Sequence, residues 1–282
     1  MERIQSAISK AREARRALDP QGPATVAADP AATSEARPAA PQERAVEAWS
    51  GLMEFRPNEH VLERGRVVSL TSNAASVPFD SMRTRLLYLI RDKGWRRIAV
   101  TSPGPGCGKT TISLNLALSL SRLADVRTVL IDADLRRPAL GKTLGVSARH
   151  QFSDVLAGKA DPARHLVRIG DSLAVGTNCA AVPNSAELLQ SPNAQHALDL
   201  VEETYQPSLM LFDLPPMLVN DDALAAVTLM DAVIVVAAAG VSTAAEIDRC
   251  EQELASRTNV VGVVLNKCRY LDKSEGYGYD YH

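Results

Sequence analysis

Residues 103–111 read PGPGCGKTT, and their types and spacing point to phosphate chemistry. They follow the apolar run 96–102 and precede an apolar helical pattern. In a loop between a strand and a helix, glycines let backbone N–H groups surround phosphates, a lysine adds positive charge and a threonine hydroxyl binds Mg²⁺. The loop therefore predicts a nucleotide site. The residues expected there are Gly104, Gly106, Cys107, Gly108, Lys109, Thr110 and Thr111.

Two features of this loop leave alternatives open. The pattern Gly-x-x-x-x-Gly-Lys-Ser/Thr would need a glycine at position 103, where the chain has Pro103, so an ordinary glycine-rich turn is the alternative interpretation. Cys107 lies inside the loop, and its thiol is interpreted either as redox-sensitive or as a passive small side chain.

Three aspartates end two other apolar runs. Asp132 and Asp134 close the run 127–134, and Asp213 closes the run 207–213. Because side chains alternate along a strand, Asp132 and Asp134 point to the same side if the strand extends through both. Carboxylates that face a phosphate loop hold Mg²⁺ through water and leave one free to accept a proton. A lone strand-end aspartate is more often a turn former, but three beside this loop predict a catalytic site.

Six apolar, β-branched runs alternate with helical patterns and must position these residues. The predicted strands are 96–102, 127–134, 172–178, 207–213, 231–238 and 259–266, and the predicted helices are 80–92, 109–123, 184–204, 221–229 and 242–256. Continuous apolar strands separated by helices indicate a mostly parallel central sheet with helices on both faces. The expected fold class is α/β, the three-layer fold of P-loop NTPases, whose ligands bind at the carboxyl ends of the strands.

Composition narrows the class of protein. The chain has 282 residues with 46% hydrophobic content, which suits one sizeable domain with appendages. A net charge of −2 argues against binding to nucleic acid. Four cysteines without metal-ligand spacing indicate a reducing compartment. The most apolar run, 231–240, is too short to span a bilayer, so we expect a cytoplasmic protein without its own membrane segment.

The two ends of the chain follow other patterns. Apolar residues at helical spacing predict an amphipathic helix over residues 1–18, either solvated or docked on a partner or membrane surface. Residues 19–48 contain five of the sixteen prolines and are predicted to be a disordered linker. Residues 49–268 form the expected nucleotide-binding domain, and 269–282 a flexible tail. That tail holds four of the six tyrosines: Tyr270, Tyr277, Tyr279 and Tyr281.

Taken together, these motifs resemble the bacterial protein-tyrosine kinases of capsule and exopolysaccharide assembly, in a cytoplasmic form. The resemblance covers residue 65 to the end and rests on PGPGCGKTT, LIDADLRRP (130–138), FDLPP (212–216) followed by Asp222-Ala223, PNSAELLQSP (183–192) and the terminal tyrosines. It implies ATP and Mg²⁺ as cofactors. It also implies a role for each position. Lys109 and Thr110 would bind the phosphates and the metal, and Asp132 and Asp213 would bind the metal. Asp134 would be the general base, and Asn266 and Lys267 would lie near the adenine ring of the nucleotide.

The resemblance further implies an autokinase that phosphorylates its tyrosine cluster between subunits and regulates exopolysaccharide polymerisation and export. From Lys267 to Tyr281 the chain can extend up to roughly 45 Å, enough to reach a neighbouring subunit. The implied partners are a membrane polysaccharide co-polymerase or chain-length regulator as activator, a cognate tyrosine phosphatase and further copies of the chain. The activator would hold the protein peripherally at the inner face of the cell membrane.

Two other functions stay open. A dimeric ATPase that positions or partitions cargo shares the fold, but such proteins usually carry a signature lysine at the position of Gly104. A nucleotide-binding scaffold without catalysis is the other alternative.

Two sets of positions bear on assembly and on phosphate steering. Family members often carry E-x-x-R-x-x-R on the helix before the loop strand, where this chain has Val77, Asp80 and Arg83, so we expect a different or partner-built oligomer. Arg136 and Arg137 are interpreted either as steering phosphate charge or as a solvated pair.

Overall fold

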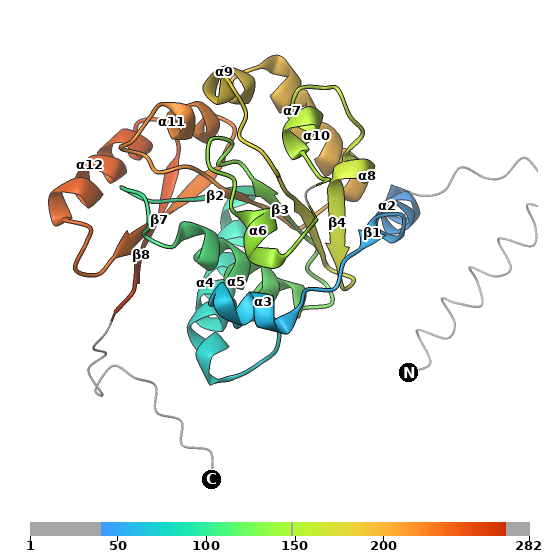
Figure 1. The fold of residues 1–282 in the computed structure, drawn as a ribbon, viewed down its shortest axis with the longest axis horizontal. Helices are drawn as coiled ribbons and strands as arrows, with labels where there is room; N and C mark the ends of the chain where they lie inside the picture. The colour runs from blue at the N-terminus through green and yellow to red at the C-terminus, as the bar shows by residue number, and fades with distance from the viewer. Residues whose placement is uncertain (1–40, 148, 269–282) are drawn as a thin grey trace, which may run out of the picture. The chain divides into compact units, whose positions relative to one another are not determined.

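A single eight-stranded sheet organises the part of the chain that the structure, a computed structural model, describes: residues 41–147 and 149–268. Its order is β1-β4-β5-β3-β6-β2-β7-β8 (Figure 1). All neighbouring strands are parallel except β4 and β5. The strands are β1 (Met53–Glu54), β2 (Arg97–Thr101), β3 (Thr128–Asp132), β4 (Leu166–Ile169), β5 (Leu173–Gly176), β6 (Leu209–Asp213), β7 (Ala232–Ala238) and β8 (Asn259–Asn266).

Helices cover both faces of this sheet, which confirms the predicted three-layer α/β fold (Figure 1). One face carries α3 (Glu59–Arg64), α4 (Val77–Lys93), α5 (Lys109–Ser121) and α6 (Leu140–Leu144). The other carries α2 (Pro41–Ser50), α7 (Phe152–Leu156), α9 (Ser185–Leu189), α10 (Pro192–Tyr205), α11 (Asp222–Val227) and α12 (Ala244–Ala255). The short helix α8 (Pro162–His165) packs on α7, and the 3-10 helix η1 (Ala74–Ser76) leads into α4.

Two hydrophobic cores lie on the two sides of the sheet because successive strand residues point to opposite faces. In β3, Val129 and Ile131 belong to one core and Leu130 to the other. Every residue of the central strands β2, β3, β6 and β7 is buried. This double burial explains why these strands have continuous apolar sequences.

The six predicted strands are all present, and two further ones were not predicted. β1 has two residues and β4 has four, so neither shows a clear alternation. The predicted helix 184–204 is two helices, because Ser191 caps a new helix by accepting a hydrogen bond from the backbone N–H of Ala194 at 3.1 Å, with Pro192 following it.

The linker prediction is wrong for residues 41–48, which belong to helix α2. This helix packs on α10 through Trp49, whose side chain is 2% exposed. The Trp49 indole Nε1 donates to the carbonyl of Tyr205 at 2.6 Å, and the guanidinium of Arg127 lies 5.7 Å from the ring centre. Composition suggested disorder because the predicted linker ended at residue 48, one position before this large anchor. The predictions for 1–18, for 19–40 and for 269–282 lie outside the described residues.

Two charged residues of helix α4, Asp80 and Arg83, bind partners within the same chain. The Asp80 carboxylate accepts hydrogen bonds from Arg122 and, at 2.5 Å, from Ser119. Arg83 lies 3.3 Å from the same carboxylate and donates to the carbonyl of Ser119 at 2.8 Å. Arg83 is therefore bound to helix α5, while Val77 is 52% exposed. Among the described helices, none is both long enough and apolar enough to cross a bilayer.

Candidate active site

The phosphate loop connects β2 to α5, as predicted. Gly106 and Gly108 have φ values of +76° and +94°, in the left-handed region that residues with a Cβ rarely adopt. A Cβ on Gly108 would also lie 2.3 Å from Nδ2 of Asn266. Gly104 has no positive φ, and a Cβ there would meet no protein atom within 4 Å, so the fold of the loop itself does not require glycine at that position. The loop thus depends on two of its three glycines.

Cys107 is buried in this loop, with 2% of its surface exposed. Its Sγ lies 3.3 Å from the carbonyl of Gly104 and 3.5 Å from Oγ of Ser242. These contacts favour the interpretation of Cys107 as a small packing side chain over that of an accessible redox-sensitive thiol.

Strand pairing brings two of the predicted aspartates side by side. Asp132 and Asp213 are register partners at the carboxyl ends of β3 and β6, which are neighbouring parallel strands. Oδ2 of Asp213 accepts a hydrogen bond from Oγ1 of Thr110 at 2.5 Å. The metal-binding residues predicted from the sequence therefore converge on one point beside the start of α5.

The third aspartate reaches the loop by a turn. β3 ends at Asp132, so strand alternation does not place Asp134. The backbone N–H of Arg137 donates to Oδ1 of Asp134 at 3.1 Å, and Nζ of Lys109 binds Oδ2 at 2.8 Å. The side chains of Lys109 and Asp134 are 14% and 6% exposed, so this is a largely buried ion pair.

Burial and charge together perturb this cluster. Burial raises the pKa of Asp132 well above its ordinary value, and the neighbouring Asp213 raises it further. Burial also raises the pKa of Asp213, partly offset by Lys109 and by the hydroxyl of Thr110. Burial alone would lower the pKa of Lys109, but Asp213 and Asp134 outweigh it and raise the pKa. One ammonium faces three carboxylates, so the cluster favours an additional cation.

The donor set fits Mg²⁺. Oδ2 of Asp132 accepts from the backbone N–H of Leu140 at 3.1 Å, but Oδ1 is buried and has no hydrogen-bond partner among the described residues. A buried carboxylate oxygen without a partner is unfavourable unless a ligand supplies one. The described residues contain no group of three His, Cys, Asp or Glu that would hold a metal alone. Mg²⁺ suits such a site because it takes most of its ligands from water and from substrate phosphates.

Two residues that position the aspartates were not predicted from the sequence. Ser113 donates to Oδ1 of Asp213 at 3.1 Å. It stands three residues after Thr110 and so on the same helix face, a spacing from which its contact with Asp213 could have been predicted. Asn178 donates to the carbonyl of Asp132 at 2.8 Å and accepts from the backbone N–H of Ser153 at 2.8 Å. No local pattern points to Asn178, because its partners are distant in sequence.

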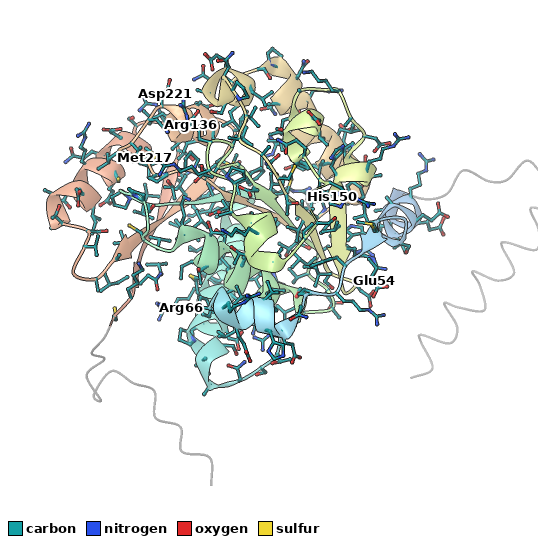
Figure 2. All side chains as sticks on the ribbon, in the orientation of Figure 1. Glu54, Arg66, Arg136, His150, Met217 and Asp221 are labelled. Carbon is teal, nitrogen blue, oxygen red and sulfur yellow. The ribbon has the colours of Figure 1, made fainter. Side chains whose placement is uncertain are left out.

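The remaining predicted residues lie around the rim. Arg136 forms an ion pair with Asp222 and lies 3.9 Å from Asp221. Figure 2 labels Arg136 and Asp221 near α11. Ser185 donates to the same Asp222 carboxylate at 2.6 Å. Arg136 therefore connects the segment after β3 to the first residues of α9 and α11, and it is not merely a solvated charge.

Residues at the end of β8 also reach the phosphate loop. Nδ2 of Asn266 donates to the carbonyl of Cys107 at 2.9 Å. Lys267 follows with φ of +61°, and its backbone N–H donates to Oδ1 of Asn266 at 2.8 Å. The structure therefore brings Asn266 to the loop, whereas Lys267 contacts Asn266 and makes no hydrogen bond or ion pair with residues 103–111, all of which the structure describes.

Known proteins are similar to this chain in sequence. A family model described as ParA, NUBPL iron-transfer P-loop NTPase, matches residues 95–280. The tyrosine-protein kinase Etk of Escherichia coli K12 is 30% identical over 213 residues, which cover 72% of this chain and 29% of Etk. The tyrosine-protein kinase CpsD of Streptococcus pneumoniae serotype 4 is 34% identical over 176 residues, 60% of this chain and 75% of CpsD. This chain thus spans less than a third of Etk.

Solved structures agree with these relatives. The kinase domain of Escherichia coli Etk superposes with a TM-score of 0.64 at 27% identity, covering 74% of this chain and 82% of that domain. The septum site-determining protein MinD of Pyrococcus horikoshii, solved with Mg-ADP, gives a TM-score of 0.51 at 20% identity over 60% of this chain and 69% of MinD, a likeness of fold alone. With CpsD matched over three quarters of its length, the chain belongs to the bacterial tyrosine-protein kinases, within the wider group of ParA-type P-loop NTPases.

Proposed function

We propose that this protein is an ATP-dependent protein-tyrosine kinase that transfers the γ-phosphoryl group of ATP to tyrosines of its own C-terminal segment. The observation that carries the proposal is the buried pair of Lys109 and Asp134 at 2.8 Å, beside the Thr110 and Asp213 contact at 2.5 Å. A phosphate-binding cation, a metal-binding pair and a candidate base, Asp134, then share one small site.

ATP binding rearranges this pair. The phosphates occupy the loop 103–111 and the N-terminus of α5, where backbone N–H groups and Lys109 bind them. Lys109 then exchanges its bond with Asp134 for one with phosphate, which frees the Asp134 carboxylate. Thr110, Asp132 and Asp213 would hold Mg²⁺, which neutralises phosphate charge when bound. Ser113 keeps Asp213 in position when Thr110 turns from it.

Asp134 is the proposed general base. A tyrosine hydroxyl has a pKa near 10, so it must lose its proton during transfer at neutral pH. In the proposed step the phenol oxygen bonds to the γ-phosphorus, the bond from that phosphorus to the bridging oxygen of ADP breaks, and the phenolic proton moves to Asp134. Products are a phosphotyrosine and ADP.

The proposed acceptors are Tyr270, Tyr277, Tyr279 and Tyr281, which lie outside the described residues. The two tyrosines within the described residues fit the role less well. Tyr205 is buried, and Tyr88, although 72% exposed, lies inside helix α4 and would need that helix to unfold to enter a catalytic site. We also propose that the transfer occurs between copies of the chain. The tail of residues 269–282, which follows the domain 49–268, would carry the acceptor tyrosines into the site of a neighbouring copy.

The proposed setting is capsule or exopolysaccharide production, as the family resemblance implies. A membrane co-polymerase or chain-length regulator would activate the kinase and recruit it to the inner face of the membrane, and a tyrosine phosphatase would reverse it. Phosphorylation would then regulate polymerisation and export.

Mixing two variants tests transfer between copies. Lys109→Met removes the phosphate-binding cation but keeps the tail, and replacing the four tail tyrosines by Phe keeps the site but removes the acceptors. We expect phosphotyrosine on the Lys109→Met chain only when both variants are expressed together. Phosphotyrosine in the wild type but none in the mixture would confine transfer to one chain. Its absence from the wild type in native cells would sink the kinase proposal.

The ParA-type family model supports a second candidate, a dimeric ATPase that positions cargo. Gly104 stands where such ATPases usually have a signature lysine, which counts against this function. Rapid ATP hydrolysis with ATP-driven dimerisation and no phosphotyrosine would favour it over the kinase.

A further inference from the structure

The strand β8 forms one edge of the sheet, and its outer side has no neighbouring strand among residues 41–147 and 149–268 (Figure 1). Backbone N–H and C=O groups on the outer side of an edge strand can pair with a further strand. The opposite edge strand, β1, has two residues, whereas β8 has eight. The sequence of β8, NVVGVVLN, contains no charged residue and no proline, which are the residues that commonly protect an edge.

The side chains of β8 are also incompletely covered. Val263 and Leu265 are the register partners of Val235 and Ala237 in β7, so all four point to the sheet face that carries α12. Val235 and Ala237 are fully buried, but Val263 is 45% exposed and Leu265 is 60% exposed. The register with β7 is regular over residues 262–266, so this part of β8 presents an exposed apolar pair on an extended strand.

The chain beyond β8 begins beside this apolar pair. β8 ends at Asn266, and Lys267 follows with a φ of +61°, a left-handed conformation that is typical of turns. A β-strand rises about 3.3 Å per residue, so β8 is about 26 Å long and residues 269–282 could extend over roughly 46 Å. The tail is therefore long enough to turn and to return along the whole of β8.

The sequence of the tail matches the exposed face of β8. Residues 276–282 read GYGYDYH, in which every second residue is a tyrosine. In an extended strand these tyrosines would share one face, as Val263 and Leu265 do. An antiparallel pairing that sets Tyr277 opposite Leu265 also sets Tyr279 opposite Val263. Pairs of aromatic and aliphatic side chains across two strands stabilise such a pairing.

We propose that the tail docks on its own chain, where residues 276–282 form a further strand antiparallel to β8 and Tyr277 and Tyr279 pack on Leu265 and Val263. Residues 267–275, which are mostly charged, would form the connecting loop. A segment joined directly to β8 has a high effective concentration there, which favours it over a second copy or another protein.

Docking of this kind would withhold the tyrosines from a catalytic site until the tail detaches. This consequence rests on the proposed function, whereas the docking itself does not. A phosphate on Tyr277 or Tyr279 would oppose docking, because its charge would lie against apolar side chains.

Hydrogen–deuterium exchange of the full chain, read by mass spectrometry, tests the docking. The protein is first treated with a tyrosine phosphatase, so that the tail is unphosphorylated whether or not the chain is a kinase. The variant carries Tyr277→Ser and Tyr279→Ser, which remove two rings and change no residue of the described domain. The matched control is Tyr88→Ser, at a tyrosine of helix α4 that is 72% exposed.

We expect the backbone amides of β8 to exchange about 2- to 30-fold faster in the double variant than in the wild type, the range for the loss of two cross-strand pairs. The amides of β2 should not change, and Tyr88→Ser should match the wild type in β8. The wild-type rates should not depend on protein concentration, because the tail belongs to the same chain.

Equal exchange of β8 in the wild type and the double variant would overturn the inference, as would an equal increase in Tyr88→Ser. Protection of β8 that grows with protein concentration and persists in the double variant would assign the edge to a second copy instead. A wild type that shows tail-dependent protection of β8 but forms no phosphotyrosine would refute the kinase proposal alone.

Discussion

Asp134→Asn separates the two roles given to the ion pair with Lys109. The substitution keeps the shape of the side chain and removes its negative charge and its capacity to accept a proton. A positioned general base contributes about 10²- to 10⁴-fold to a rate, so phosphotyrosine formation should fall by that factor. This corresponds to roughly 3–5 kcal/mol of transition-state stabilisation.

ATP binding should respond in the opposite direction. In the wild type the phosphates must draw Lys109 away from a carboxylate 2.8 Å distant, whose hydrogen bond contributes about 1.5–3 kcal/mol. Without that bond, ATP affinity should stay the same or rise by up to about tenfold. The free energy of unfolding without nucleotide should fall by about 1–3 kcal/mol, because Lys109 loses a buried partner but retains Asp213 nearby.

Calorimetric titration with Mg-ATP, denaturant unfolding and phosphotyrosine quantification by mass spectrometry measure the three effects. Asp171→Asn is the matched control, since the Asp171 side chain is fully exposed and lies in the loop between β4 and β5. Weaker ATP binding in Asp134→Asn would refute the idea that Lys109 must leave Asp134 when ATP binds. Undiminished phosphotyrosine in the same variant would refute the role of Asp134 in proton transfer.

Three further outcomes follow from the geometry. Gly108→Ala should destabilise the loop by roughly 1–3 kcal/mol and weaken ATP binding, because of its φ and the 2.3 Å approach to Asn266, whereas Gly104→Ala should leave the melting temperature unchanged. Trp49→Ala should lower the free energy of unfolding by about 3–5 kcal/mol in urea titrations, and a loss below 1 kcal/mol would contradict the docking of α2. Burial raises the pKa of Tyr205 to about 12, so the folded state should lose stability as pH rises from 10 towards 12, and Tyr205→Phe should remove that part of the loss in circular-dichroism melts.

Much of the site was predictable because its residues stand at strand ends. Asp132 and Asp213 each close an apolar run, and in a parallel sheet the carboxyl ends of neighbouring strands meet at one edge. The strand-loop-helix pattern likewise placed Lys109 and Thr110. Asp134 was expected beside the loop and lies there, bound to Lys109. It reaches the loop through a turn, because β3 ends at Asp132, and not through strand alternation.

The parts that escaped prediction depend on contacts between distant residues. Asn178 reaches the carbonyl of Asp132 from 46 positions away, and Asn115 holds Arg66 from 49 positions away. Arg136 was interpreted as steering phosphate charge or as solvated, because its partner Asp222 belongs to another element. Helix α2 was missed because composition averages over residues 19–48, whereas the largest anchor of the helix, Trp49, follows that segment and its partner Tyr205 is distant in sequence.

Phosphopeptide mass spectrometry of the protein isolated from its native cells tests the central claim most directly. Phosphate is expected on one or more of Tyr270, Tyr277, Tyr279 and Tyr281 in the wild type and on none of them in Lys109→Met. Arg64→Gly serves as a control for handling and expression. Unmodified tail tyrosines in the wild type, or the same phosphorylation in Lys109→Met, would contradict the assignment of this chain as its own tyrosine kinase.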